Sequence, residues 1–258
     1  MRSTVQFPFL LLLALGSLVA PAVHAENKLT FGTGLDYSYG KYGDTVRTET
    51  FYVPFSAKYE VSDWTFRATV PYVESIGPAT VSGSGVDRVA LDTNKGSRHR
   101  ASGLGDVVVG LSWTALEYQG WLLDFGSKAK LATANKNEGL GTGKNDYSVQ
   151  TDVYRSQGAL TLFGTLGYKR MGDPEGVDLR NPLFISLGSS YKASSNTSLG
   201  LSYDFRQNLR DGGQPMREVT GFLSYRMDQS WKLQGYLVAG FSDASPDLGV
   251  GMMVFYGY

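Results

Sequence analysis

The sequence predicts an all-β protein, a transmembrane up-and-down antiparallel β-barrel of twelve strands. Three observations lead to this prediction. Apolar and polar residues alternate along most segments, short and long connections alternate between those segments, and all four tryptophans lie beside the short connections. Alternation with period two is typical of strands, and a membrane barrel needs one strand face for lipid and the other for its lumen.

The predicted strands are separated by residues that favour turns. They cover residues 28–40, 46–59, 64–74, 104–116, 121–134, 147–155, 159–170, 182–192, 197–206, 216–226, 231–242 and 248–258. The short connections are 60–63, 117–120, 156–158, 193–196 and 227–230, and the others are 41–45, 75–103, 135–146, 171–181, 207–215 and 243–247. In outer-membrane barrels the short turns face the periplasm and the longer loops face outside, so this division predicts an orientation.

Apolar residues occupy the face that would point outward, as Phe51, Val53 and Phe55 do, whereas Thr50 and Ser56 lie on the opposite face. A soluble β-sandwich would instead turn its polar face outward, and its connections need not fall into two length classes. Closure of the sheet is required in lipid, because an unpaired backbone group there costs several kcal/mol.

Aromatic residues predict the two membrane interfaces. The four tryptophans, Trp64, Trp113, Trp121 and Trp231, fall within a few residues of a short turn and would form an interface girdle at the headgroup level. The opposite girdle would contain Tyr37, Tyr39, Tyr72, Tyr147, Tyr168 and Phe241.

The two ends of the chain predict its cellular route. Arg2, an apolar stretch at 7–20 and Val23-His24-Ala25 are typical of a cleaved signal peptide at residues 1–25, followed by a barrel at 26–258. The strictly alternating segment 248–258 ends on Tyr258 and resembles the closing strand of bacterial outer-membrane barrels. That resemblance implies a Gram-negative outer-membrane location, with Tyr258 as the signal read by the assembly machinery.

Two motifs resemble a specific family. Residues 102–106, Ser-Gly-Leu-Gly-Asp, and residues 139–147, Gly-Leu-Gly-Thr-Gly-Lys-Asn-Asp-Tyr, resemble the transporter family named for the meta-cleavage pathway of phenol degradation. The resemblance implies an exported outer-membrane barrel. The family's usual Pro-Thr-Gly turn before the second motif is absent, because residues 131–134 read Leu-Ala-Thr-Ala.

Composition excludes several other classes. Without residues 1–25, 23 basic residues face 24 acidic ones, so net charge suggests no nucleic acid as a partner. The absence of cysteine excludes disulfides and thiolate metal sites. We expect no cofactor and no metal, since the acidic residues of the loops lack an EF-hand spacing. Residues 141–144, Gly-Thr-Gly-Lys, do not complete a phosphate-binding loop.

Charged residues on the inward face predict the solute path. Twelve strands tilted by about 40° give a bore on the order of 10 Å, which admits a small solute. We therefore expect a monomeric channel for small, hydrophobic or aromatic molecules, because Phe163, Phe184, Phe222, Tyr236, Val238 and Phe255 also face inward. The predicted lumen residues are Arg67, Asp124, Lys128, Asp152, Asp204 and Arg206.

Two alternatives remain open. The first is a barrel with a filled lumen and a structural or adhesive role, in which basic loop residues bind the phosphates of lipopolysaccharide; these are Arg88, Lys95, Arg98 and Arg100. The second is an envelope lipid hydrolase, which only His99 and fold analogy support. We do not expect an enzyme, since no nucleophile or acid accompanies His99. Segment 75–103 is too long for a simple connection, and either folds into the barrel mouth or extends outside.

Overall fold

The structure is a computed structural model that describes residues 27–92 and 98–258, so the predicted signal peptide lies outside the described residues. Two 3-10 turns, η1 (Gly85–Asp87) and η2 (Lys136–Glu138), accompany the strands. The strands are β1 (Lys28–Gly40), β2 (Thr48–Val61), β3 (Trp64–Gly77), β4 (Ala79–Ser82), β5 (Val89–Asp92), β6 (His99–Leu104), β7 (Val107–Tyr118), β8 (Trp121–Leu131), β9 (Asp146–Gln157), β10 (Leu160–Arg170), β11 (Leu183–Lys192), β12 (Thr197–Arg206), β13 (Met216–Arg226), β14 (Trp231–Gly240) and β15 (Leu248–Gly257).

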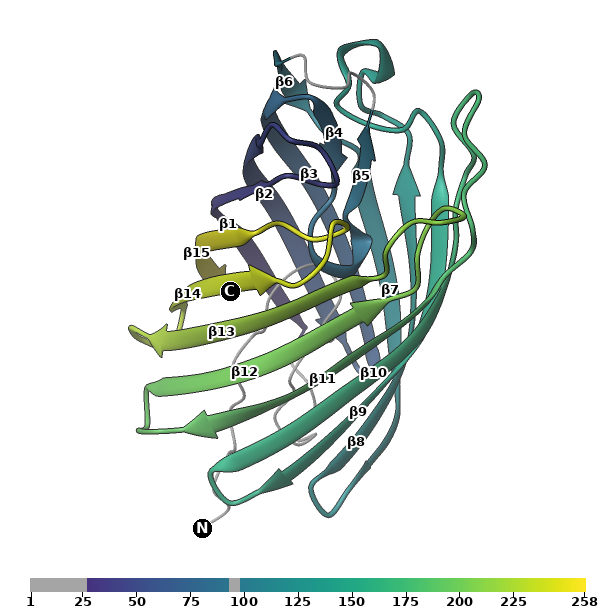
Figure 1. Cartoon of the computed structure of the whole chain (residues 1–258). Coiled ribbons are helices and arrows are strands. Elements are labelled where there is room, and N and C mark those ends of the chain that lie inside the picture. Colours follow the sequence, from purple (N-terminus) through teal and green to yellow (C-terminus); the bar gives the residue numbers. More distant parts are fainter. Residues whose placement is uncertain (1–26, 93–97) are drawn as a thin grey trace.

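The strands close into an antiparallel barrel, as Figure 1 shows. Apart from β4 and β5, which pair only with each other, and β6, which pairs with β3, each strand pairs with the next wall strand along the chain, and β15 pairs with β1 to complete the ring. At the seam, the backbone N–H groups of Leu29 and Tyr258 each donate to the carbonyl of the other, at 3.1 and 2.8 Å. The predicted twelve-stranded barrel is confirmed, because β6 and β7 lie along the same edge of β3 and count as one wall position.

The fourth wall position differs from its predicted strand. It begins at His99 rather than at 104, and it is interrupted at Gly105 and Asp106. Pro71 of β3 lies opposite this interruption and has no N–H to donate, while its carbonyl accepts a hydrogen bond from the Gly105 N–H at 2.8 Å. The interruption is therefore a bulge, and it directs the Asp106 side chain into the buried interior.

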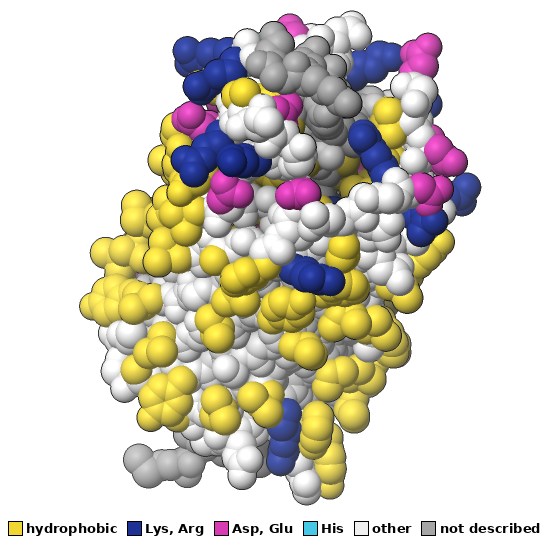
Figure 2. Space-filling view, viewed as in Figure 1, with side chains coloured by type: hydrophobic (Ala, Val, Ile, Leu, Met, Phe, Trp, Pro, Cys, Tyr) yellow, Lys and Arg dark blue, Asp and Glu magenta, His cyan; other side chains and the backbone are white. Residues whose placement is uncertain are grey.

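All five predicted short turns lie at one end of the barrel, here called the turn end. Three of them are two-residue reversals, and Ser62, Gln119 and Gly120 adopt positive φ angles of 51°, 47° and 81°. Such angles match the twist of the flanking strands in tight hairpins. The longer connections lie at the opposite, loop end, where charged side chains gather in Figure 2.

The outer surface of the wall is apolar and its inner surface is polar. Leu187 is 56% exposed on the outside, whereas its chain neighbour Ser186 is 1% exposed inside. Figure 2 shows apolar side chains spread over the wall below the charged loop end. A water-soluble protein does not expose so large an apolar area, so this surface fits a lipid bilayer. Within the described part of the chain, no helix is long and apolar enough to cross a membrane.

Five inward-facing aromatic rings each lie over a glycine of the adjacent strand. In the strand register, Phe222 faces Gly200 directly, and a Cβ atom on Gly200 would lie 2.1 Å from Cζ of that ring. The other pairs are Phe163 with Gly188, Phe184 with Gly167, Tyr236 with Gly251 and Phe255 with Gly32. The rings thus lie along the wall instead of projecting straight across the lumen.

Candidate functional site in the barrel mouth

Residues 78–92, here called the inserted loop, fold into the loop end of the barrel. This segment contains β4, η1 and β5, and β4 pairs only with β5. Its apolar side chains pack against wall and loop residues on several sides. Val86 packs with Phe184 and Met216, and Val89 packs with Met171, Leu179 and Leu209. Residues 78–92 of the long predicted connection 75–103 therefore lie inside the mouth.

Arg88 anchors the inserted loop to strand β13 of the wall. Its guanidinium donates to the Glu218 carboxylate of β13, and both side chains are at most 3% exposed. Arg206 of β12 donates to the backbone carbonyls of Val86, at 3.0 Å, and Arg88. Charge-assisted hydrogen bonds are stronger than neutral ones, and here two arginines take part in holding the loop at Val86 and Arg88.

Asp87 anchors the same loop to β8 and β10, the part of the wall that lies next to β12 and β13 across β11. Its two carboxylate oxygens accept from Lys128 Nζ of β8 at 2.9 Å and from Lys169 Nζ of β10 at 3.1 Å. Burial alone would raise the pKa of this carboxyl, but the two ammonium groups outweigh burial and hold its pKa well below its usual range. Asp87 is therefore an ionised carboxylate in a two-lysine site.

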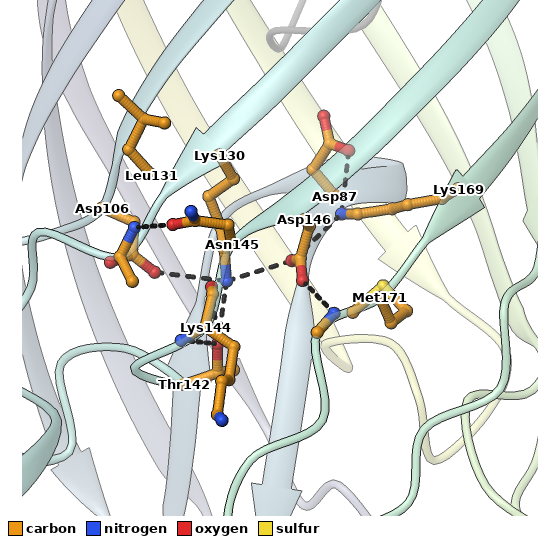
Figure 3. Close-up of polar contacts among 12 residues, drawn as sticks. Asp87, Asp106, Lys130, Leu131, Thr142, Lys144, Asn145, Asp146, Lys169 and Met171 are labelled. Carbon is orange, nitrogen blue, oxygen red and sulfur yellow. Dashed lines mark hydrogen bonds and ion pairs between the residues drawn. The ribbon is translucent and has the colours of Figure 1, made fainter.

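The network continues from Lys169 along the wall, as Figure 3 shows. Asp146 lies 3.9 Å from Lys169 Nζ and 3.0 Å from Lys130 Nζ, and Lys130 Nζ also lies 3.3 Å from Asp106. These contacts define the mouth cluster: Asp87, Asp106, Lys128, Lys130, Asp146 and Lys169. Three carboxylates balance three lysines while the inserted loop is in place.

A small cavity lies beside the mouth cluster. It has a volume of about 30 Å³ and is lined by Asp87, Lys128, Lys130 and Lys169, together with apolar residues such as Tyr52 and Val73. A cavity of this size holds about one or two water molecules. The inward side chains below it are also poorly accessible, since Thr165, Ser186 and Thr220 are 1 to 3% exposed. The described conformation is therefore closed to solutes.

With this geometry established, comparison with solved structures identifies similar folds. An outer-membrane channel from Pseudomonas putida F1 matches over 90% of this chain and 94% of that one, with a TM-score of 0.62 and 11% identity. The NanC porin matches with a TM-score of 0.56 and 11% identity, over 88% of this chain and 98% of its own. The KdgM porin matches with a TM-score of 0.54 and 9% identity, over 88% of this chain and 98% of its own. No protein-family model matches the chain, and no curated protein matches it. At such identities the likeness shows the fold alone.

The six predicted lumen residues lie on the inner face but do not form one row. Lys128 and Arg206 both hold the inserted loop. Asp124 and Asp152 face each other across β8 and β9. Arg67 lies opposite Lys58, and Asp204 accepts from Ser186 Oγ at 2.5 Å. The six residues therefore belong to separate groups along the inner face.

Of the residues predicted to contact lipopolysaccharide, one is misplaced. Arg88 was expected on the outer surface, and this expectation is wrong because its guanidinium is buried against Glu218. Lys95 lies outside the described residues. Arg98 and Arg100 are exposed at the rim, where they form ion pairs with Glu49 at 3.1 Å and Glu74 at 2.8 Å. Their contact with lipid phosphates stays a prediction.

The remaining predicted residues occupy the two edges of the wall. Trp64, Trp113, Trp121 and Trp231 are 41 to 47% exposed at the turn end, and the centroids of the stacked Trp64 and Trp113 rings lie 6.2 Å apart.

Tyr258 is 88% exposed at the seam, and its role in assembly stays a prediction. His99 is exposed at the start of β6. Within residues 27–92 and 98–258, no three His, Asp or Glu side chains converge as a metal site.

Several members of the mouth cluster have little signal in the sequence. Asp87 is one of the acidic loop residues without an EF-hand spacing, and Asp146 ends the predicted connection 135–146. One signal was present: Val86 and Val89 flank the charged pair Asp87-Arg88 inside a segment otherwise rich in small polar residues. Apolar residues on both sides of a charged pair indicate that the pair is carried into an interior.

Proposed function

We propose that this chain is an outer-membrane channel for small molecules and that hydrophobic or aromatic solutes are its preferred cargo. The observation that carries the proposal is the closed wall, whose outer face is apolar and whose inner face is polar and charged. Such a wall gives a solute a water-accessible route through lipid once the mouth is open. The chain would reach the outer membrane through a cleaved signal peptide and the assembly machinery, and would act as a monomer.

The preference for aromatic solutes has two supports. Inward-facing rings form a patch below the mouth, in which Tyr154, Phe163, Phe222 and Tyr236 pack with Leu122 and Val238. The motifs at 102–106 and 139–147 resemble the phenol-degradation transporter family. Because the rings lie over glycines, an aromatic solute can stack on them as it passes. Arg67, Asp124, Lys128, Asp152, Asp204 and Arg206 would then act as polar contacts along the path.

A filled barrel that serves as a structural or adhesive protein is the second candidate. The observation that favours it is the low exposure of the mid-barrel side chains Thr165, Ser186 and Thr220. In this case the exposed Arg98 and Arg100 would hold lipopolysaccharide, and no solute would pass.

Flux measurements separate the two candidates. Purified protein is reconstituted into liposomes, and swelling is followed with phenol, benzoate and glucose, alongside conductance in planar bilayers. The channel proposal expects swelling and brief openings for the native chain, and a higher open fraction for Glu218→Gln, which loosens the inserted loop. The matched control is Glu138→Gln, because Glu138 is exposed on η2. Absence of swelling and conductance in all three proteins would support the filled barrel.

A further inference from the structure

Asp87 is held by the wall of the barrel in the manner of a bound carboxylate ligand. Both of its oxygens accept from lysines, and those lysines come from two strands, β8 and β10, not from its own loop. Within the described part of the chain, Lys128 forms an ion pair with Asp87 alone. The wall thus provides a two-lysine carboxylate site that the inserted loop fills.

Charge balance shows what happens when the inserted loop withdraws. The wall members of the mouth cluster are Lys128, Lys130 and Lys169 against Asp106 and Asp146, so loss of Asp87 leaves one excess positive charge. Lys130 keeps both aspartates, at 3.3 and 3.0 Å. Lys128 and Lys169 lose their closest partner, which in a partly desolvated mouth is unfavourable unless another anion takes its place.

The surroundings of this site favour an aromatic carboxylate. The cavity beside Asp87 is lined on its apolar side by Tyr52, Pro71 and Val73. The Phe184 ring centroid lies 6.0 Å from Lys128 Nζ. A ligand with a carboxylate and a flat apolar body matches this combination, whereas a sugar does not. The cavity holds about one or two waters, so such a ligand can enter only when Asp87 leaves.

We propose that Lys128 and Lys169 form a binding site for small aromatic carboxylates and that Asp87 occupies this site as a built-in competitor until a solute displaces it. This proposal rests on the proposed channel function and gives it a substrate class. The solute's own carboxylate would open the path by replacing the contact that closes the mouth.

Equilibrium binding tests the site independently of transport. Benzoate and its neutral analogue benzyl alcohol are titrated into detergent-solubilised protein by calorimetry. Benzoate is expected to bind and benzyl alcohol to bind at least about tenfold more weakly, because only benzoate can replace Asp87. Asp87→Asn should tighten benzoate binding about tenfold by removing the competitor, while leaving benzyl alcohol unchanged. The double variant Asp87→Asn/Lys128→Gln should lose this gain.

Matched controls and a second readout keep the proposal testable if Asp87→Asn folds poorly. Asp211→Asn and Lys136→Gln make the same changes at exposed loop positions and should behave as the native chain. Because the chain has no cysteine, Ser84→Cys places a single thiol in the inserted loop, where residue 84 is buried. Benzoate, but not benzyl alcohol, should accelerate its labelling by a water-soluble maleimide.

The outcomes separate the site from the channel. Benzoate binding without flux in liposomes would support the carboxylate site and refute the channel proposal. Flux combined with equal binding of benzoate and benzyl alcohol, or with a labelling rate that benzoate does not change, would overturn the carboxylate site and leave the channel standing.

Discussion

The two ends of the barrel share the same twelve strands but are held together by different contacts. At the turn end, partners are close in sequence: Asp228 accepts from the N–H groups of Ser230 and Trp231 at 2.8 and 2.7 Å. At the loop end, partners are distant in sequence: Arg88 and Glu218 are 130 positions apart, and Asp87 and Lys169 are 82 apart. The turn end can therefore form with each hairpin, whereas the loop end needs a wall that is already in place.

Because of this difference, the mouth can open without loss of the barrel. The inserted loop contributes no strand to the closed sheet, since β4 and β5 pair only with each other. Its release breaks ion pairs and apolar contacts but leaves the wall hydrogen bonds intact. The predictions below test this separation, beginning with the largest expected effect.

Glu218→Gln should release the inserted loop. The change leaves the Arg88 guanidinium buried beside a neutral partner, and loss of one member of a buried ion pair typically costs about 3–5 kcal/mol. The loop can avoid this cost by leaving the mouth, so hydrogen exchange of residues 78–92 should accelerate strongly while exchange in β9 to β13 stays unchanged. Glu138→Gln is the exposed control. Equal exchange in the native chain and the Glu218 variant would show that the loop is not held by this pair.

Gly200→Ala should destabilise the wall shared by both ends. The added methyl would lie 2.1 Å from the Phe222 ring, and overpacking of this kind costs about 1–3 kcal/mol. Gly221→Ala is the matched control, because its Cβ would meet no atom within 4 Å. Urea unfolding of vesicle-bound protein measures both changes. Further replacement of Phe222 by Leu should recover only the part of the loss that the ring causes, because the methyl would also lie 2.4 Å from the Ser189 backbone oxygen. Absence of any recovery would argue against the contact between ring and glycine.

The part of the fold that the sequence predicts is the part governed by local rules. Strand alternation places Leu187 outward and Ser186 inward, and turn residues locate all five reversals. The site was predicted less well, because ion pairs across a barrel leave no periodic signal. In the sequence, a charged pair such as Asp87-Arg88 is typical of a solvated loop. Its partners on β8, β10 and β13 come close to it only when the barrel closes. The break at Gly105 was missed for the same reason, since it depends on Pro71 of another strand.

Substitution by glycine should stabilise the turn end slightly. Ser62 and Gln119 hold positive φ angles of 51° and 47°, which cost a non-glycine residue about 1–2 kcal/mol. Glycine relieves this strain, but it also raises the conformational entropy of the unfolded chain, which lowers stability. Ser62→Gly and Gln119→Gly should therefore each raise the free energy of unfolding by at most about 1 kcal/mol. Ser230→Gly, at a turn residue outside the left-handed region, should instead lose a few tenths. A loss at Ser62 or Gln119 comparable to that at Ser230 would contradict the assigned turn geometry.

The smallest expected effect is the response of the mouth to mild acid. The pKa of Asp87 in the docked loop lies below its ordinary value of about 3.9, so the carboxylate favours docking fully above that ordinary value and loses its effect only as pH falls through the lower, docked pKa. Between pH 8 and pH 5 the ratio of the open fractions of the native chain and the Asp87→Asn variant in bilayer recordings should therefore change by less than about twofold. The Asp87→Asn variant, which has no proton to gain at this position, should have the same pH profile as the native chain at a higher open fraction. A rise in opening between pH 7 and pH 5 that disappears in this variant would mean that Asp87 gains its proton in that range, and that the two lysines do not hold it as an ionised carboxylate.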